Sequence, residues 1–393
     1  MDAAAQPEPI FTGPFLRLSA ASFLIFASFQ GLMAVIAPFM LQHRMSVEAV
    51  GLSGAAFVLT AVAVRLPVGH LLDRYGRLGF LRVGLAVIGL VFAAYPWGTV
   101  LPVLVALRIL HGVGWGLAST ASATLVQDVV PPRRRGEATG YYANFGDLAM
   151  AFGPFLAVAA LSHWGFAAFS WIAAAAMGLA ILLLAKMPHT QRPPAHERPR
   201  SWVQRGAVLP SAIQFLMNIN FGAVMTFLPV LAARRGLLHP VAGVDAYGFF
   251  YVGYAFTLLL FRGWLGRLSD TFGRFAVILP GLGVFAVAAL FLSRLHTLPS
   301  LIAFSVLFGL GFGAAQPSVL AWTMERNPPA ERGAAAGTYF AAFDLGIGVS
   351  ALAFGPLAAI SFRRVMEVAA AATVAAMALA AHAARTPRGA GPG

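Results

Sequence analysis

The chain of 393 residues contains no cysteine, and only 10% of its residues are charged. Without cysteine it has neither a disulfide framework nor a thiol nucleophile, and cysteine usage gives no information about the redox compartment. Hydrophobic residues make up 59% of the chain, too many for the few charged ones to keep the folded protein soluble in water. These shortages exclude a disulfide-rich fold, thiol catalysis and a water-soluble protein.

Catalytic and cofactor motifs are missing as well. The sequence contains no HExxH metal motif, no nucleophile motif in a suitable context and no nucleotide-binding motif, so a primary pump would require a separate subunit. The formal net charge is +13, yet no basic run is interleaved with aromatic residues as a nucleic-acid site requires. We therefore expect no enzyme activity, no metal, no other cofactor and no nucleic-acid partner.

Long hydrophobic runs are abundant instead. A helix needs ~20 residues to cross a bilayer, and breaks in the hydrophobic pattern divide the chain into twelve such segments. They cover about residues 18–42, 48–72, 79–98, 100–127, 136–160, 164–186, 208–232, 243–269, 275–295, 297–325, 333–360 and 362–384. The sequence predicts an all-α integral membrane protein with twelve transmembrane helices in the lipid bilayer.

A single offset of 197 residues maps polar residues of the first half of the chain onto the second half. Arg65, Gly69, Asp73, Gly76 and Arg77 recur as Arg262, Gly266, Asp270, Gly273 and Arg274. Asp128, Pro131, Pro132, Arg135, Gly136, Gly140, Tyr142 and Asp147 recur as Glu325, Pro328, Pro329, Arg332, Gly333, Gly337, Tyr339 and Asp344. We therefore predict two pseudo-symmetric six-helix halves, residues 1–186 and 208–393, joined by a proline-rich, charged cytoplasmic linker at 187–207. Two parallel repeats whose interface can enclose a site are typical of a transporter.

The distribution of basic residues predicts the orientation in the membrane. With both termini in the cytoplasm, 18 of the 27 lysine and arginine residues lie inside, 6 lie outside and 3 lie within the spans. The positive-inside rule then predicts a multi-pass protein of the plasma (inner) membrane with both termini cytoplasmic. The segment before Arg17 has no basic n-region or cleavage pattern, so we expect the first span to be retained.

Two copies of one turn motif resemble a known family. The stretches GHLLDRYGR, Gly69 to Arg77, and GRLSDTFGR, Gly266 to Arg274, join spans 2 to 3 and 8 to 9. They resemble the signature loops of the major facilitator superfamily, and the resemblance covers nearly the whole chain. LRILHGVG around Arg108 is similar to the arginine motif of that family, and FGP in span 5 resembles its antiporter motif. The usual glycine pair after FGP is replaced by Ala157 and Val158, but the overall pattern resembles the twelve-span bacterial efflux members, which are drug:proton antiporter-like.

The resemblance implies roles for residues at the cytoplasmic rim. Asp73 would contact the start of span 11, Arg77 would pair with Asp128, and Arg274 would pair with Glu325, so that these contacts hold one conformation and release when the halves rock. The implied conformational motif comprises Gly69, Asp73, Arg74, Gly76, Arg77, Asp128, Asp270, Gly273, Arg274 and Glu325. Ordinary surface ion pairs, worth ~0–1 kcal/mol each, are the alternative interpretation.

Two glycine clusters, at residues 112–116 and 309–313, lie inside apolar spans. With no preceding strand or βαβ unit, they do not indicate dinucleotide binding. Small residues let helix backbones approach closely, so both clusters predict helix-packing surfaces.

Four charged residues lie at similar depths inside the spans. At ~1.5 Å per residue from the cytoplasmic ends, Arg65 and Arg262 lie ~12 Å deep, and Asp147 and Asp344 lie ~16 Å deep. Each would cost ~2.5–3.5 kcal/mol if isolated at the bilayer centre, so each must face a partner, water or substrate. The resemblance places span 2 against span 11 and span 5 against span 8, which implies the pairs Arg65–Asp344 and Arg262–Asp147. A gate role for these residues and a proton-carrier role for Asp147 or Asp344 both stay open.

The remaining polar residues of the spans are candidates for the substrate cavity. Arg108 has no symmetry partner, and with His111 one turn further in it either faces the cavity or bonds to structural groups. Gln30, Asn144, Gln214, Asn218, Asn220 and Gln316 either line the cavity or bridge helices. Tyr141, Tyr142, Phe145, Tyr339, Phe340 and Phe343 either pack or form a binding wall.

The sequence as a whole predicts a monomeric secondary transporter that moves a small-molecule substrate by alternating access. Protons are the expected coupling ion, and efflux of an amphipathic or cationic compound by antiport is the expected direction. The alternative is uptake or exchange of a small organic anion bound by Arg65, Arg108 and Arg262. A membrane receptor or an intramembrane enzyme has no supporting motif.

Overall fold

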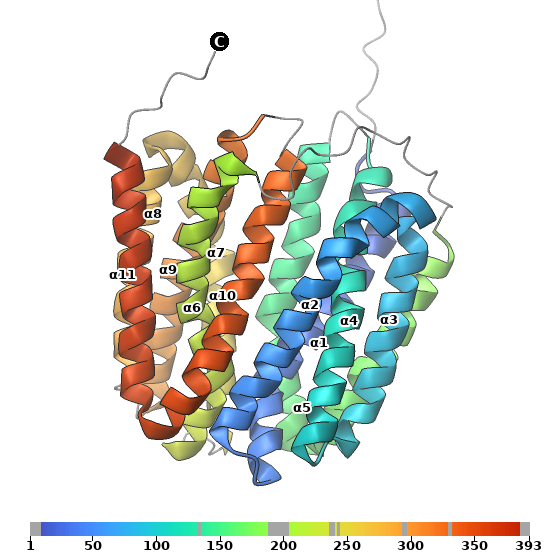
Figure 1. The fold of residues 1–393 in the computed structure, drawn as a ribbon, viewed down its shortest axis with the longest axis vertical. Coiled ribbons are helices and arrows are strands. Elements are labelled where there is room, and N and C mark those ends of the chain that lie inside the picture. The colour runs from blue at the N-terminus through green and yellow to red at the C-terminus, as the bar shows by residue number, and fades with distance from the viewer. Residues whose placement is uncertain are drawn as a thin grey trace, which may run out of the picture. The chain divides into compact units, whose positions relative to one another are not determined.

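The computed structural model describes residues 9–131, 135–187, 204–235, 240–241, 244–292, 297–328 and 332–385. Eleven long helices dominate these residues (Figure 1), and each contains a segment long and apolar enough to cross a membrane. The helices are α1 (Gly13–Gln42), α2 (Val47–Tyr75), α3 (Arg77–Ala94), α4 (Leu101–Leu125), α5 (Arg135–Ala185), α6 (Arg205–Arg234), α7 (Gly248–Phe272), α8 (Arg274–Leu292), α9 (Leu298–Glu325), α10 (Arg332–Ile360) and α11 (Phe362–Arg385). Short 3₁₀ turns follow α3 and α4, at η1 (Tyr95–Trp97) and η2 (Val126–Asp128).

Helix α5 differs from the prediction of twelve separate helices. It runs for 51 residues and combines the spans predicted at 136–160 and 164–186. At ~1.5 Å per residue such a helix is more than twice as long as the ~30 Å hydrocarbon core, so it cannot cross only once. Gly165 breaks it with φ 80° and ψ 174°, a conformation that glycine adopts without steric penalty. The chain therefore turns back at Gly165. The turn is so tight that only Gly165 has a non-helical conformation, so the two predicted spans form one continuous helix assignment.

A short hairpin between α6 and α7 was not predicted. Strand β1 (Pro240–Val241) pairs antiparallel with β2 (Val244–Asp245), with Pro240 opposite Asp245. Two residues per strand are too few to produce an alternating pattern in the sequence. The fold class nevertheless remains all-α, as predicted.

The chain forms two compact units. The first unit comprises Met1–Leu32 and Thr60–His196, and the second comprises Met33–Leu59 and Glu197–Gly393. Residues 33–59 belong to α1 and α2 but pack within the second unit. The repeat halves 1–186 and 208–393 stay a prediction about the sequence.

The repeat extends to the packing inside each unit. A Cβ atom on Gly84 of α3 would lie 2.7 Å from the backbone nitrogen of Ala118 in α4. The equivalent Cβ on Gly281 of α8 would lie 3.1 Å from the nitrogen of Ala315 in α9. Gly114 and Gly311, from the two glycine clusters, form the facing surfaces. The prediction that these clusters pack helices is therefore confirmed.

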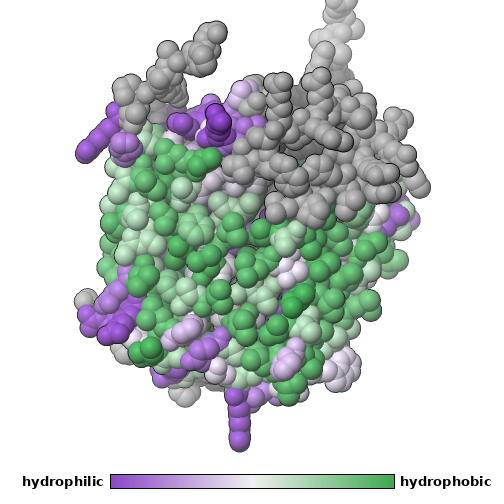
Figure 2. Space-filling view, in the orientation of Figure 1, coloured by the Kyte–Doolittle hydropathy of each residue, from purple (hydrophilic) through white to green (hydrophobic). Residues whose placement is uncertain are grey.

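Large hydrophobic side chains cover much of the exterior. Leu90 is 72% exposed, Trp164 70% and Ile360 75%. In Figure 2, hydrophobic residues fill most of the described surface in view, and hydrophilic residues gather towards its two ends. Such a surface is stable only when lipid covers it, as in a multi-pass membrane protein.

Candidate functional site

An ion pair joins the start of α3 to the end of α4 in the first unit. Gly76, with φ 92°, ends α2 and lets the chain turn directly into α3 at Arg77. Arg77 Nη1 lies 2.5 Å from Asp128 Oδ1 and also donates a hydrogen bond to the Thr124 carbonyl at 3.1 Å. The two charged side chains are only 14% and 17% exposed. The sequence pairing of Arg77 with Asp128 is thus present in the structure.

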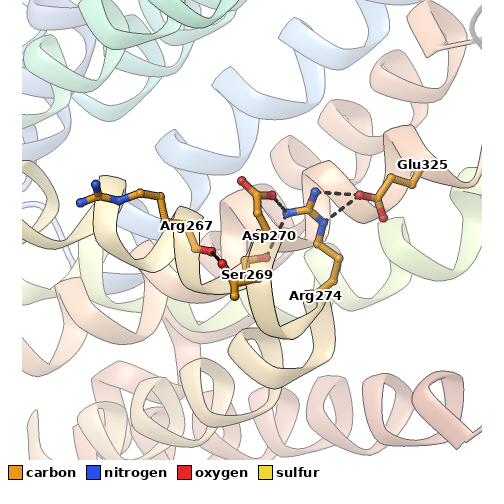
Figure 3. Close-up of polar contacts among 6 residues, drawn as sticks. Arg267, Ser269, Asp270, Arg274 and Glu325 are labelled. Atoms are coloured by element: carbon orange, nitrogen blue, oxygen red, sulfur yellow. Dashed lines mark hydrogen bonds and ion pairs between the residues drawn. The ribbon is translucent and has the colours of Figure 1, made fainter.

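The second unit repeats this arrangement, and here the carboxylate of Asp270 is also described. Gly273 has φ 92°, and Arg274 follows it as the first residue of α8. Arg274 Nη2 lies 2.7 Å from Glu325 Oε1, while Nη1 lies 2.5 Å from Asp270 Oδ1 (Figure 3). Asp270 and Glu325 are 65% and 40% exposed, so water screens this pair more than the pair in the first unit. We call the Arg77 and Arg274 clusters the two rim pairs.

Part of the turn motif cannot be placed. The surroundings of Gly69 and the side chains of Asp73 and Arg74 lie outside the described residues, and so does the predicted contact of Asp73 with the start of span 11. In the other copy, Arg267 points away from the cluster around Arg274 (Figure 3).

A tyrosine bridges three helices in each unit, half-buried at Tyr142 and fully buried at Tyr339. The Tyr142 hydroxyl of α5 accepts a hydrogen bond from Ser22 of α1 at 2.8 Å and lies 2.5 Å from the Ser122 hydroxyl of α4. Its repeat counterpart Tyr339 of α10 donates to Gln214 Oε1 of α6 at 2.6 Å and contacts the Gln316 carbonyl of α9 at 3.1 Å. The repeat offset relates the two tyrosines, and their geometry assigns them to helix bridging in these units.

The two intramembrane arginines that the repeat relates, Arg65 and Arg262, each bond to the fourth helix of their own repeat. Arg65 Nη2 donates to Ser119 Oγ at 3.1 Å, and Arg262 Nη2 donates to Gln316 Oε1 at 3.4 Å. Residues 119 and 316 are themselves related by the offset of 197. Sequence reasoning named Gln316 only as a general cavity candidate and missed Ser119, although the repeat could have found both.

Of the two carboxylates predicted to face these arginines, the structure describes the side chain of one. Asp344 is half-buried on α10, and the side chain of Asp147 on α5 lies outside the described residues. The pairs Arg65–Asp344 and Arg262–Asp147 join residues of different units, and they stay predictions.

Arg108 and His111 lie in the interior of the first unit, where both are 0% exposed. The Tyr95 hydroxyl, from η1, lies 2.9 Å from His111 Nδ1 and is also a hydrogen-bond partner of Arg108. The His111 ring packs edge-on against Phe92 with centroids 5.1 Å apart. A substrate role for these residues stays a prediction, as it does for Gln30, which is half-buried on α1.

Asn218 bridges helices in the second unit. It is fully buried, accepts a hydrogen bond from Gln214 at 2.8 Å and donates one to the Phe343 carbonyl of α10 at 2.8 Å. With the Tyr339 bonds, these contacts tie α6, α9 and α10 together beside Asp344. The side chain of Asn144, the other predicted cavity amide, lies outside the described residues.

The segment 33–59 packs tightly on the second unit. A Cβ on Gly51 would collide with the Ala351 carbonyl oxygen of α10, and a Cβ on Gly348 would lie 2.7 Å from Val58 Cγ1. Tyr247, just before α7, donates a hydrogen bond to the Ala34 carbonyl at 3.2 Å. Burial raises the pKa of the Tyr247 hydroxyl, so it keeps the proton that it donates. We call this contact the α1–α2 seal.

These features define a class of protein. The helices cross a membrane repeatedly, charged residues lie inside the spans, and each repeat carries the same ion-paired turn. Duplicated helical bundles with polar groups inside the spans are the architecture of secondary transporters.

Comparisons with known proteins identify the family. The profile of the Major Facilitator Superfamily matches residues 18–253 and 211–392, so the chain belongs to this superfamily. An MFS-type transporter of Methanocaldococcus jannaschii is 23% identical, over 82% of this chain and 86% of its own length. Another from Burkholderia pseudomallei is 25% identical, over 96% and 94%.

Solved structures share the fold. A mutant of the nucleoside transporter NupG matches with a TM-score of 0.79 and 13% identity, covering 94% of this chain and 99% of its own. An autoinhibited POT family peptide transporter matches with 0.76 and 13%, covering 97% and 99%. Membership of the superfamily confirms that the chain is a multi-pass membrane transporter and not an enzyme. Members of the family bind small-molecule substrates within the membrane.

Proposed function

We propose that this transporter exports an amphipathic or cationic compound in exchange for protons, as a monomer in the plasma membrane with both termini cytoplasmic. The observation that carries the proposal is the duplicated set of intramembrane arginines, each on a polar acceptor of its own repeat. A charge kept inside a span at such cost indicates a gate, a coupling site or a substrate site. The antiporter-like motif and the surplus of basic residues on one side support the direction and the orientation.

The rim pairs are the proposed conformational latch. Each binds the start of the third helix of a repeat to the end of the fourth helix. The more exposed Arg274 pair contributes only ~0–1 kcal/mol, an amount that a rocking motion can release and recover, whereas the shielded Arg77 pair is the stronger contact. The Arg274 pair is therefore the one better suited to break and re-form during transport.

The α1–α2 seal is the proposed outer gate. In the predicted topology, the α1–α2 connection at residues 43–46 faces outside, and its neighbours 33–59 pack on α10. Backbone-to-backbone contact at Gly51 leaves no room for a side chain or substrate there. Closure at this end corresponds to the inward-facing stage of alternating access.

Asp147 and Asp344 are the proposed coupling carboxylates. Protonation would abolish their attraction for an arginine, so proton entry and gate opening can share one step. The FGP motif in α5 lies beside α1, because a Cβ on Gly153 would lie 2.8 Å from Ala27 Cα. This close helix contact supports an antiporter-like hinge, despite the replacement of the usual glycine pair by Ala157 and Val158.

Transport of protons against a panel of substrates tests the function. Purified protein in liposomes with an acidic interior and a pH-sensitive dye is challenged with cationic dyes, neutral sugars or peptides, nucleosides and organic anions. We expect a cation to trigger proton release, and Asp147→Asn or Asp344→Asn to abolish it. Coupled export through these carboxylates would be contradicted if no cation triggered proton release. It would also be contradicted if both variants still released protons in response to a cation.

Asp344→Asn also tests the gate. Removing the negative charge weakens the proposed pair with Arg65, so the inward-facing state should gain population. Because the chain has no cysteine, a single Val58→Cys reports on the outer gate by maleimide labelling. Val58 is 6% exposed, and its cysteine should react more slowly in the Asp344→Asn background. An unchanged labelling rate would remove the gate assignment while leaving the proton assay to decide coupling.

An organic anion is the alternative substrate. It would use Arg65, Arg108 and Arg262, but Arg108 is 0% exposed beneath Tyr95 and His111, which weighs against direct contact in this conformation. A response to anions alone in the liposome assay, lost on replacing the arginines, would establish this alternative.

A further inference from the structure

A proline interrupts the hydrogen bonding of α1 near its C-terminal end. Pro38 lies inside this helix and has no N–H, so it cannot donate to the carbonyl four residues earlier, that of Ala34. Ala34 is 0% exposed, and every residue from 34 to 40 is buried. In a membrane span, a carbonyl freed in this way is satisfied by a neighbouring group, because leaving it without a donor is costly. The sequence of α1 therefore requires a donor for Ala34 from outside the helix.

Tyr247 supplies this donor. Its hydroxyl donates a hydrogen bond to the Ala34 carbonyl at 3.2 Å, and the tyrosine is itself 0% exposed. The two residues are 213 positions apart in the chain, and both belong to the second unit. Because α1 enters the second unit at Met33, Ala34 lies at the beginning of the part of α1 that packs there. The hydrogen bond thus holds the α1–α2 seal at the point where α1 joins the second unit.

A second proline of this unit shows the same arrangement. Pro210 lies inside α6 and frees the carbonyl of Gly206. Arg326, which follows the last residue of α9, donates a hydrogen bond from Nε to that carbonyl at 3.1 Å. At both places a side chain from a distant segment replaces the missing backbone donor, so the freed carbonyl becomes an attachment point for that segment.

We propose that the carbonyl freed by Pro38 and the hydroxyl of Tyr247 form a lock that favours the closed state of the α1–α2 seal. This inference rests on the proposed function, in which the seal is the outer gate. When the seal opens, the Ala34 carbonyl exchanges the hydroxyl for water, so the lock contributes only the net strength of one neutral hydrogen bond. A contact of that strength can break and re-form in every transport cycle. Tyr247 is thus a positioning residue, which acts on transport through the seal.

Removal of one hydroxyl tests the lock. Tyr247→Phe keeps the ring and loses the donor, so Val58→Cys should be labelled about two- to tenfold faster in this background, as expected for one neutral hydrogen bond. Tyr251→Phe is the matched control, because the Tyr251 hydroxyl is also buried and bonds to no other group that the structure describes. The control should leave the labelling rate unchanged. Equal acceleration by both variants would overturn the lock, since the loss of either buried hydroxyl would then loosen the region.

Restoring the backbone donor tests the role of the proline. Pro38→Ala provides an N–H that bonds to the Ala34 carbonyl within α1, whether the seal is open or closed. The hydroxyl then adds little, so Tyr247→Phe should accelerate labelling less than about twofold in the Pro38→Ala background. The same acceleration with and without Pro38 would show that the hydroxyl acts independently of the proline, which would overturn the proposal.

Gly51→Leu separates failure of the lock from failure of the outer gate. Its side chain obstructs the seal by shape, so Val58→Cys labelling should rise whether or not the lock exists. If Gly51→Leu accelerates labelling and Tyr247→Phe does not, the lock is overturned and the outer gate stands. If neither substitution changes the labelling rate, the assignment of the seal as the outer gate fails together with the lock.

Discussion

At the scale of single residues, exposure distinguishes interactions that look alike in the sequence. The two rim pairs derive from the same motif, yet the Arg77 pair is 14% and 17% exposed while Glu325 of the Arg274 pair is 40% exposed. A carboxylate that loses its partner is stable in water but costly when shielded from it. The repeat therefore conserves the contact but not its energy.

This difference predicts unequal effects of two matched substitutions. Arg77→Ala removes the ion pair of a carboxylate that is largely shielded from water and should destabilise the protein by about 2 kcal/mol. Arg274→Ala leaves two solvated carboxylates and should cost less than about 1 kcal/mol. Thermal unfolding of both variants in the same detergent gives the comparison. Equal losses of stability would show that the exposure of the carboxylates does not control these pairs.

At the scale of helices, the close approach of backbones determines which glycines matter. In α3, a Cβ on Gly84 would meet the backbone of α4, whereas a Cβ on Gly79 would meet nothing within 4 Å. Both glycines lie in the same helix, so their intrinsic helix propensity is the same. The two positions therefore differ in how closely they pack against a neighbouring helix.

Alanine substitutions at these two positions should act in opposite directions. Gly84→Ala should destabilise by about 1–3 kcal/mol, because α3 and α4 must separate to admit the methyl group. Gly79→Ala should stabilise by up to about 1 kcal/mol through helix propensity. Apparent melting temperatures relative to the parent protein measure both effects. A neutral Gly84→Ala variant would mean that the contact between α3 and α4 is looser than the structure has it.

At the scale of the whole molecule, residues 33–59 decide what the transporter can do. They come from the first half of the repeat but pack with the second unit, on α10. The closest contacts of the seal, at Gly51 and Gly348, involve backbone and apolar side chains, while Tyr247 adds one hydroxyl bond and Glu48 places one charge beside Gly355 of α10. The close approach of the backbones therefore makes shape the main control of this gate.

Obstructing the seal should therefore hold it open. The side chain of Gly51→Leu would collide with the Ala351 backbone, which cannot move aside as a side chain can. We expect substrate transport to be lost and Val58→Cys labelling to rise about tenfold, equivalent to a shift of ~1.4 kcal/mol in the gate equilibrium. Gly178→Leu is the control, because a Cβ there meets nothing within 4 Å. Wild-type transport by Gly51→Leu would exclude the seal as a moving gate.

The sequence by itself determined the membrane class, the two-fold repeat and the rim motif. Hydrophobic length forces helices to cross the bilayer, and a fixed offset brings Arg77 with Asp128 and Arg274 with Glu325 into equivalent places. The same offset relates Ser119 to Gln316. A single polar residue in an apolar span does not, however, indicate its partner until the structure shows the contact.

Only the tertiary structure decided which groups those residues meet. The helical turn at Gly165 depends on one backbone conformation, and the burial of Arg108 depends on the packing of the first unit, which brings Tyr95 to it. Periodicity places a side chain on a face of its helix, but it does not determine which neighbour covers that face. Contacts between distant segments, such as Gly51 with Ala351, arise from packing that no local pattern encodes.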